Sequence, residues 1–280
     1  MLVKNREDYY SQPYVLYNLV EQLKYRYLSS IKKKNGKNVL SRYYLGYSID
    51  LLKQSLEKLG VLKDITTKLY FDLSIWKNDD GNTPMITFDT KERKKDKDWF
   101  NKEYLKYFKG YDFGIDVDAK DINKAYKDTK EIKVLFDKYK LPYSIKMSGS
   151  KGFHLLIENK WFDGRIKAKN KVLLCKKLSK VIMNVCRLKS ITEGGTFDDT
   201  IYDDRRIFKL AYSLQNKNGK EYCCLPLDDY QFENWKLEEM ELENVMKKVK
   251  LFKRGLLTRT YGLSDKQLRN NLRKFIKECK

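Results

Sequence analysis

The spacing of apolar residues in the first third of the chain predicts helices followed by strands. Five apolar residues recur there at helical spacing: Leu16, Leu19, Val20, Leu23 and Tyr27. A basic stretch that contains Gly and Asn, residues 31–41, is expected to connect this helix to the next one. Ser41 is a candidate N-cap for the second helix, and Gly60 lies just past its expected end. Residues 68–76 and 85–88 then predict two strands around a turn-rich loop, as in a hairpin.

The middle of the chain predicts an ordered succession of strands and helices. Helical patterns cover residues 122–139, which end before Pro142, and residues 167–188. The expected strands are residues 111–118, 143–147, 153–157, 207–214 and 221–227. The resulting order, strand–helix–strand–strand–helix–strand, is that of the split βαβ sheet in ferredoxin-like and RRM-like folds.

The last fifty residues predict helices again. Residues 233–250 are acidic first and Lys-rich last, which suits the helix dipole, and Ser264 with Gln267 resembles a capping box. An α+β protein is therefore expected. Its parts, within one compact unit, are a helical and β-hairpin N-terminal lobe (residues 1–105), the ferredoxin-like core (106–230) and a helical C-terminal extension (231–280).

Charge and composition suggest the kind of partner. The 280 residues include 59 Lys and Arg against 38 Asp and Glu, a formal net charge of +21. Such a surplus favours a polyanion, because each neutralised phosphate releases a counterion, although a Lys-rich proteome gives the same composition. The sequence has no apolar run long enough for a membrane span and no apolar signal core at its start. Five cysteines fit free thiols, so an intracellular location, the cytoplasm or nucleoid, is expected.

The first candidate site is the acidic pair Asp116 and Asp118. Residues two apart on a strand point to the same face, about 6.5–7 Å from one another. Two such carboxylates repel each other unless they are protonated or bridged by a cation. Mg²⁺ and Mn²⁺ take oxygen ligands, and two of these ions can assist a phosphoryl displacement. An ordinary surface turn is the alternative, but the apolar residues Phe113, Ile115 and Val117 favour a strand.

The second candidate is a Gly-rich segment between two predicted strands, residues 148–154. Its glycines, Gly149 and Gly152, let backbone amides approach an anion closely. The side chains that add donors and positive charge are Ser148, Ser150, Lys151 and His154, the only histidine of the chain. Together they suit a triphosphate. A hairpin turn beside a packed histidine is the alternative.

A third segment, residues 197–210, mixes acids with basic residues. Asp198 or Asp199 could add a third carboxylate to the metals, and Arg206 and Lys209 could contact phosphates or a template. A solvated run of charges is the ordinary alternative. Because the chain has one histidine and no Cys-x-x-Cys pair, no zinc is expected.

Taken in order, these segments resemble the catalytic core of archaeo-eukaryotic primases and primase–polymerases. That superfamily has an apolar strand with Asp-x-Asp, a Ser-Gly-x-x-Gly-x-His phosphate motif and a strand with a third Asp. Residues 213–219 are similar to a further run in small primase subunits, although Gln215 stands where those often have His. The stretches that match the three motifs are residues 115–118, 148–154 and 198–210.

The resemblance implies the roles of the site residues in a template-directed nucleotidyltransferase. Asp116, Asp118 and Asp198 would hold two Mg²⁺ or Mn²⁺ ions, and Asp198 is favoured over Asp199 by its offset to the Tyr and Arg that follow. The residues that would bind the incoming triphosphate are Ser148, Ser150, Lys151, His154, Arg206 and Lys209.

The implied partners are a single-stranded DNA template, a primer strand and NTPs or dNTPs, with a large primase subunit or a helicase as candidate partners. A repair polymerase of end joining would use the same residues. A basic RNA-recognition-like module without catalysis is the third interpretation. Such modules display paired aromatic residues where this chain has two acids, which favours an enzyme.

Overall fold

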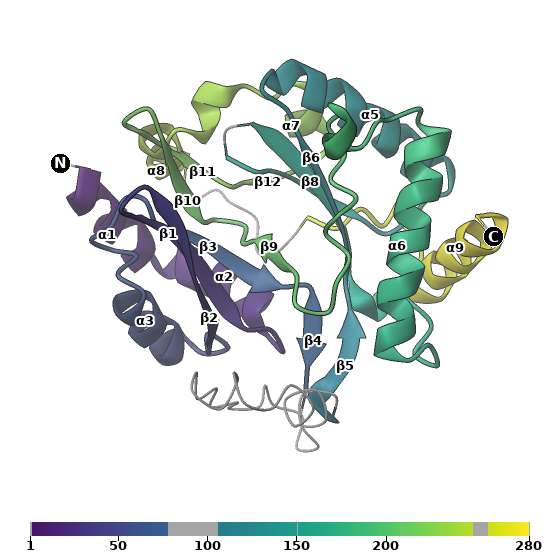
Figure 1. Ribbon diagram of the computed structural model, residues 1–280, viewed down its shortest axis with the longest axis horizontal. Coiled ribbons are helices and arrows are strands. Elements are labelled where there is room, and N and C mark those ends of the chain that lie inside the picture. Colours follow the sequence, from purple (N-terminus) through teal and green to yellow (C-terminus); the bar gives the residue numbers. More distant parts are fainter. Residues whose placement is uncertain (1, 78–105, 150, 249–256, 280) are drawn as a thin grey trace.

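Two antiparallel four-stranded sheets lie at the centre of the molecule, with helices around them (Figure 1). The structure is a computed structural model that describes residues 2–77, 106–149, 151–248 and 257–279. The helices are α1 (Leu2–Ser11), α2 (Pro13–Leu23), α3 (Ile49–Lys58), α5 (Ile122–Lys138), α6 (Ala168–Val185), α7 (Asp229–Glu233), α8 (Leu242–Lys248) and α9 (Asp265–Glu278).

The strands are β1 (Leu28–Lys34), β2 (Lys37–Tyr44), β3 (Lys68–Asp72), β4 (Ser74–Trp76), β5 (Phe108–Tyr111), β6 (Phe113–Asp118), β7 (Ser144–Met147), β8 (Gly152–Ile157), β9 (Ile207–Lys209), β10 (Leu214–Lys217), β11 (Lys220–Cys223) and β12 (Pro226–Leu227). Short 3₁₀ turns are η2 (Asn159–Trp161), η3 (Ile191–Glu193) and η4 (Leu237–Met240). Mixed in this way, the helices and antiparallel sheets confirm the α+β class.

The central sheet, which contains the acidic strand, has the order β12-β7-β8-β6. Strand β8 pairs antiparallel with both β6 and β7, so β6, α5 and β7 form a βαβ unit with β8 inserted between its strands. Helix α5 packs on β6 and β8 and covers one face of the sheet. The helices predicted over residues 122–139 and 167–188 are confirmed as α5 and α6.

The second half of the expected ferredoxin-like order does not form. After α6 the chain turns at Gly194, which has a φ of +77°. Only a single antiparallel bridge, from Val117 to Phe197, follows along the free edge of β6. The next strand, β9, joins the other sheet, and β12 becomes the fourth strand of the central sheet at its β7 edge. Residues 191–200 form turns, and several of their backbone hydrogen bonds are made within the segment. Too few extended residues are therefore left to form a full strand beside β6.

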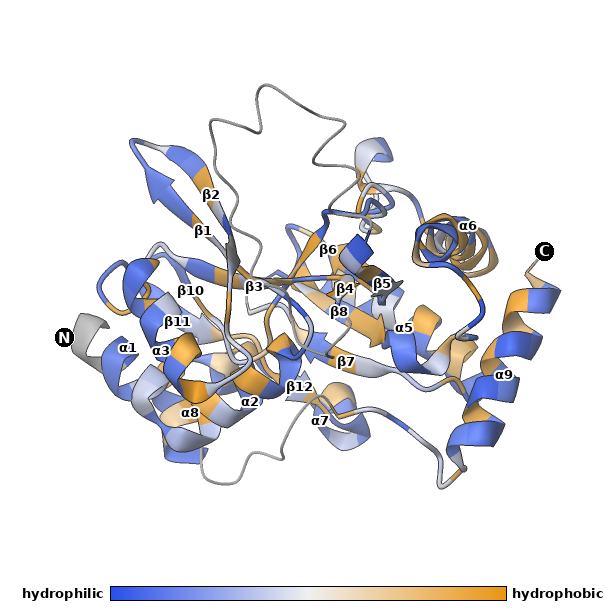
Figure 2. Ribbon diagram, turned by 90° about the horizontal axis from the view of Figure 1, so that it is seen from below, coloured by the Kyte–Doolittle hydropathy of each residue, from blue (hydrophilic) through white to orange (hydrophobic). Residues whose placement is uncertain are grey.

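The second sheet, called the outer sheet below, has the order β2-β1-β3-β9. Here the prediction of a connection over residues 31–41 is wrong, because β1 and β2 form a hairpin that projects from the body (Figure 2). Asn35 and Gly36 make its turn with φ values of 50° and 74°, as two-residue hairpin turns require. Residues 33–40, around its turn, are exposed, so no apolar alternation marks the hairpin in the sequence.

The helix predicted from Ser41 starts later. Helix α3 begins after Ser48, whose side chain accepts a hydrogen bond from the backbone N–H of Leu51. Ser41 instead pairs with Ser30 in the hairpin. At the other end Gly60, with a φ of +68°, follows the helix as expected. The first predicted helix corresponds to α2, which ends at Leu23, before the buried Tyr27, and a further helix, α1, precedes it.

Several long predicted elements are divided in the structure. Residues 68–76 form β3 and β4, which belong to different sheets, and residues 207–214 and 221–227 divide into β9 to β12. The strand expected at residues 85–88 lies outside the described residues. In place of one helix over 233–250 there are η4 and α8. Met240, the last residue of η4, is buried in the core. The predicted capping box at Ser264 is confirmed at the start of α9.

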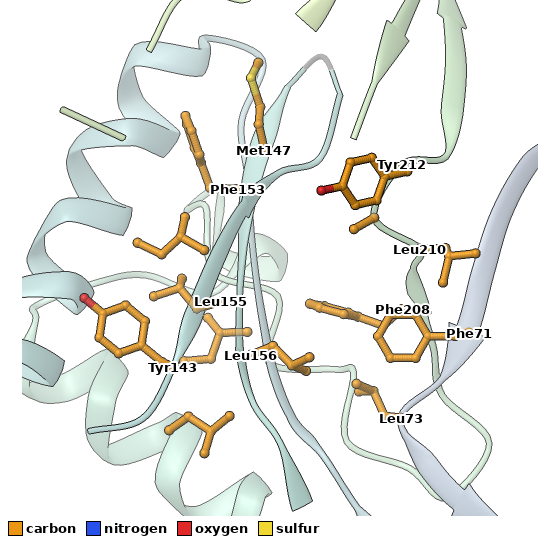
Figure 3. Close-up of a cluster of buried hydrophobic side chains, with 14 of the residues drawn as sticks. Phe71, Leu73, Tyr143, Met147, Phe153, Leu155, Leu156, Phe208, Leu210 and Tyr212 are labelled. Atoms are coloured by element: carbon orange, nitrogen blue, oxygen red, sulfur yellow. The ribbon is translucent and has the colours of Figure 1, made fainter. Parts of the chain in front are cut away.

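The apolar core fills both faces of the central sheet (Figure 3). On one face, Phe153 and Leu155 point towards the helices. On the other, Leu156 points towards Phe71 and Phe208 of the outer sheet. In the described part of the chain, no helix has the length and apolarity needed to cross a membrane. The two sheets thus meet across a packed interface, and the predicted site lies where this interface opens.

Candidate active site

A cavity of about 450 Å³ opens between the central and outer sheets. The hairpin β1–β2, strand β3 and the segment before β9 form one wall, and β6, β8 and the Gly-rich turn form the other. Seven of the residues predicted from sequence line it: Asp116, Asp118, Ser148, Lys151, His154, Arg206 and Lys209. Segments far apart in the sequence therefore meet in one place.

The acidic pair lies on β6, on the face that looks towards the outer sheet. Asp116 pairs in register with His154 of β8, and the His154 Nε2 atom is 3.3 Å from Asp116 Oδ1. Asp116 Oδ1, apart from this contact with His154, and Asp118 Oδ1 are both buried and accept no well-aligned hydrogen bond among the described residues. Buried carboxylate oxygens that lack donors are costly, and a bound cation would satisfy them.

The two carboxyl groups differ in proton affinity. Burial raises the pKa of Asp118, and the neighbouring charge of Asp116 raises it further, against the effect of Lys151. Burial acts in the same direction on Asp116, but the interaction with His154 and the positive charges of Lys151 and Arg206 outweigh it, so the pKa of Asp116 lies below its usual value. Asp116 and Asp118 therefore titrate as a coupled pair, in which Asp116 is the stronger acid.

The third acid, Asp198, lies next to Asp116 along the edge of β6. Its backbone N–H donates to the Asp116 carbonyl at 2.9 Å. Its carboxylate accepts hydrogen bonds from Arg206 at 3.2 Å and from the Thr200 hydroxyl at 2.6 Å. The following residue, Asp199, is turned the other way and accepts a hydrogen bond from Ser190 at 2.5 Å.

The Gly-rich turn joins β7 to β8. The Ser148 N–H donates to the Gly152 carbonyl at 2.8 Å, and Gly149 has a φ of +110°, which favours glycine. A Cβ atom at Gly152 would come within 2.2 Å of the Val117 carbonyl oxygen, so the close approach of the turn to β6 requires glycine there. Ser150 lies outside the described residues.

Lys151, half-exposed at the tip of this turn, forms an ion pair with Asp118 at 2.5 Å. Burial lowers the pKa of Lys151, but the hydrogen bond and the charge of Asp118 outweigh this, and the net pKa is raised. The lysine thus stays charged over the acidic pair, where it can exchange the carboxylate for a phosphate.

Lys209 is placed differently from a free phosphate ligand. It is buried, and its ammonium donates to the Ser148 carbonyl at 2.6 Å and to the Gln215 side chain. Burial lowers its pKa to about 8. Gln215, the departure from the family pattern, therefore holds Lys209 under the turn, close to Gly149.

Three polar residues of the cavity wall lie outside the segments that the sequence singles out. Arg42 comes from the hairpin, and Lys68 and Tyr70 come from β3. Burial and the charges of Asp116 and Asp118 raise the pKa of the Tyr70 hydroxyl. The only signal in the sequence is the i, i+2 spacing of Lys68 and Tyr70, which places both on one face of a predicted strand. That this face lies opposite Asp116 and Asp118 is decided by the tertiary structure.

The acids do not form a complete metal site as they stand. Within residues 2–77, 106–149, 151–248 and 257–279, no group of three or more Asp, Glu, His or Cys side chains is arranged to hold an ion. The buried Oδ1 atoms of Asp116 and Asp118 fit a divalent cation, whereas the carboxylate of Asp198 is engaged by Arg206 and Thr200. The residues present therefore fit a cation at the acidic pair.

Comparison with solved structures identifies the fold. No family model and no curated protein matches the sequence. The structure is similar to the polymerase domain of ligase D from Mycobacterium tuberculosis, solved in complex with DNA, with a TM-score of 0.58 and 11% sequence identity over 88% of each chain. The chain has the fold of that polymerase domain. The prediction drawn from the three motifs is confirmed at the level of the fold.

Two structures of the primase RepB′ also align with the chain. One aligns with a TM-score of 0.41 and 8% identity, over 94% of this chain and 68% of that one. The other, the catalytic domain in complex with initiator DNA, aligns with a TM-score of 0.42 and 8% identity, over 85% of this chain and 94% of that one.

Proposed function

We propose that the chain is a template-directed nucleotidyltransferase that synthesises or extends primers on single-stranded DNA. One observation carries the proposal: Asp116 and Asp118, each with a buried carboxylate oxygen that makes no hydrogen bond among the described residues, line the same cavity as the Gly-rich turn and His154. A cation site beside an anion site is the arrangement that transfer of a nucleotidyl group requires.

Asp116 and Asp118 would hold a divalent ion, and Asp198 would complete a site for a second. Bound Mg²⁺ or Mn²⁺ would supply Lewis acidity for a primer hydroxyl and charge compensation for the phosphates. The role of the protein is to hold the carboxylates in place. Backbone pairing of Asp198 with Asp116 and of β6 with β8 supports that role.

The incoming triphosphate would lie over the Gly-rich turn. Lys151 would leave Asp118 and bind a phosphate, and His154, stacked on Phe208 with ring centroids 4.3 Å apart, would hold a fixed orientation beside it. Ser148, Ser150 and Arg206 would add donors. Lys209 would act mainly by fixing the turn from below, because its ammonium is already bound to the Ser148 carbonyl.

The template would bind to the basic surface without being read by sequence. The net charge of +21 favours contacts to the phosphate backbone, which position a nucleic acid but carry no sequence information. We also propose that the protein works inside the cell, as its five free thiols suit a reducing compartment, and that a large primase subunit or a helicase is a partner.

The direct test is incubation with a single-stranded DNA template, labelled NTPs or dNTPs and Mg²⁺ or Mn²⁺, with and without a primer. We expect labelled products that depend on the template and on the metal. If no product forms with any combination of nucleotide, metal and primer, the proposal is wrong.

Substitution of the acidic pair is the matching residue-level prediction. We expect Asp116→Ala and Asp118→Ala each to reduce nucleotide incorporation by about 100-fold or more, because charge in the transition state loses its compensation. Template binding, measured by fluorescence anisotropy, should persist. Incorporation at the wild-type rate by both variants would reject the metal assignment.

A repair polymerase of end joining is the second candidate, favoured by the likeness to the ligase D polymerase domain. It would use the same cavity. The two functions differ in substrate, so the discriminating assay compares primer synthesis from free nucleotides with the filling of a gap or overhang that has a 5′-phosphate. Efficient gap filling without primer synthesis would favour the repair enzyme.

A further inference from the structure

A buried lysine that the proposed mechanism does not use lies behind the cavity. Lys146 belongs to β7 and pairs in register with His154 of β8, and it is 2% exposed. Among the described residues, no carboxylate lies within ion-pair distance of its ammonium. A buried charge without a counter-ion is unfavourable, so retaining one there calls for a compensating role.

The contacts of Lys146 lead across the interface to the outer sheet. Its ammonium donates to the backbone carbonyl of Lys209. It also lies 4.6 Å from the ring centroid of Phe208 and 5.0 Å from that of Phe71, within cation–π range of both. Figure 3 shows these two rings side by side, facing β8.

Two of these three contacts, Phe208 and Lys209, support groups of the proposed nucleotide site. Phe208 stacks on His154, and the Lys209 ammonium donates to the Ser148 carbonyl in the Gly-rich turn. Lys146 thus joins β7, which leads into the turn, to β9, which supports it. In the low-dielectric interface its charge also acts on an anion bound over the turn more strongly than a solvated charge would.

We propose that Lys146 is a positioning residue for the phosphate end of the bound nucleotide, which fixes β9 against the Gly-rich turn and adds positive charge beneath it. The inference rests on the proposed function, since the anion is a nucleoside triphosphate. Burial lowers the pKa of Lys146 to about 8, which leaves the ammonium mostly charged at pH 7. Its effect should appear in nucleotide binding rather than in template binding.

The test uses Lys146→Met in the full chain, with Lys171→Met as the matched control. Lys171 is also a buried lysine with one side-chain partner, since its ammonium donates to Asn159 at 2.7 Å, but it lies on α6 away from the cavity. Binding of inorganic triphosphate is measured by calorimetry, together with KM and kcat for nucleotides, the template Kd and the melting temperature.

We expect Lys146→Met to weaken triphosphate binding and to raise the nucleotide KM by about tenfold, with a smaller change in kcat and an unchanged template Kd. Lys171→Met should lower the melting temperature but keep the triphosphate affinity. Lys146→Arg, which keeps the charge, should bind triphosphate more tightly than Lys146→Met. If Lys146→Met does not fold, Lys146→Gln gives the same comparison, because it keeps a donor for the Lys209 carbonyl.

Two results overturn the inference alone: triphosphate binding by Lys146→Met equal to that of the wild type, or an equal loss of binding in Lys171→Met. A wild-type protein that does not bind triphosphate at all overturns the phosphate site of the proposed function, and the inference with it.

Discussion

At the scale of single residues, two neighbouring acids show how strongly position decides role. Asp198 and Asp199 are adjacent in sequence, yet Asp198 follows the edge of β6 and is bound by Arg206, while Asp199 is bound by Ser190. Asp198 starts a turn in which its carboxylate accepts hydrogen bonds from the Thr200 N–H and hydroxyl, so the two neighbouring carboxylates are held by different partners.

The different partners of Asp198 and Asp199 lead to a paired prediction. Asp198→Ala should reduce nucleotide incorporation by about 100-fold, because the acid beside Asp116 is lost. Asp199→Ala should retain incorporation within a few-fold of the wild type. Both are measured by primer extension at saturating nucleotide. The reverse order of activities would assign the third carboxylate to Asp199.

The side chains of the Gly-rich turn give a second residue-level prediction. Lys151→Ala combined with His154→Ala should raise the KM for nucleotides by about tenfold, with a smaller change in kcat, because both side chains are proposed to contact the triphosphate. Steady-state kinetics at fixed template measures both constants.

Lys160→Ala is the control for lost surface charge. Lys160 is exposed to nearly the same extent as Lys151 and is likewise paired with a carboxylate, that of Glu158 at 2.7 Å. Its replacement should leave the nucleotide KM unchanged. Weaker template binding by the double variant, with an unchanged nucleotide KM, would assign the turn to the template instead.

At the scale of elements, the turn between β7 and β8 depends on its contact with β6. Gly152 pairs with Asp118 in the ladder, and the space for its missing Cβ is filled by the Val117 carbonyl and by the Asp118 carboxylate. The acidic strand and the phosphate turn are therefore fixed to each other by backbone contact, which holds the two predicted ligand sites at a constant separation.

Gly152→Ala tests this contact. The added methyl should force β6 and β8 apart and lower the free energy of unfolding by about 1–3 kcal/mol, with a large loss of incorporation. Gly164→Ala is the control, since no atom lies within 4 Å of the corresponding Cβ position. Urea denaturation measures both. Equal stability of the Gly152 variant and the wild type would show that the turn can yield.

At the scale of the whole molecule, the outer sheet unites the two ends of the fold. Strand β3 pairs with β1 of the N-terminal region and with β9 from beyond α6. Its last residue, Asp72, is buried, and one of its carboxylate oxygens accepts a hydrogen bond from the Trp76 indole at 3.1 Å. Burial raises the pKa of Asp72 to about 7, although Arg42, the Trp76 hydrogen bond and Arg26 act in the opposite direction.

This buried acid predicts how stability depends on pH. Because its pKa is higher in the folded than in the unfolded chain, the folded state binds the extra proton between about pH 4 and pH 7. Its contribution to stability is full below pH 4 and is lost as the pH rises towards 7, at a cost on the order of 2–4 kcal/mol.

Asp72→Asn, which resembles the protonated acid, should therefore gain stability relative to the wild type as the pH rises from 5 to 8. Urea denaturation at both pH values measures the difference. Asp50→Asn, at an exposed acid of α3, should show no such change. A constant difference between Asp72→Asn and the wild type would mean that Asp72 is ionised in the folded protein across this range.

The sequence predicted the first half of the central sheet, from β6 to β8, and the residues that meet at its cavity, because the signals there are local. Helix α5 begins at Ile122 and β7 and β8 flank the Gly-rich turn, as the apolar periodicity and the glycines indicated. Asp116 and Asp118 share a face because strand geometry requires it. Their role as metal ligands stays a prediction.

The outer sheet could not be predicted in the same way. The pairing of β9 with β3 joins residues more than a hundred positions apart, and no local pattern encodes such a partner. The hairpin β1–β2 was missed because its exposed strands carry the basic run from Lys32 to Lys34 in place of alternating apolar residues. The burial of Lys146 could not be predicted either, because a lysine in a strand sequence normally indicates an exposed position.

The close packing of the two sheets also limits which amino-acid substitutions the chain can accept. Gly114 on β6 leaves space for Leu73 and Phe208, and a Cβ there would come within 3.2 Å of both side chains. A bulkier residue at Gly114 has to be matched by a smaller one at Leu73 or Phe208, positions far away in the sequence. Exchange of the first 77 residues for those of a distant relative should therefore destabilise the fold unless the residues opposite Leu73 change with them.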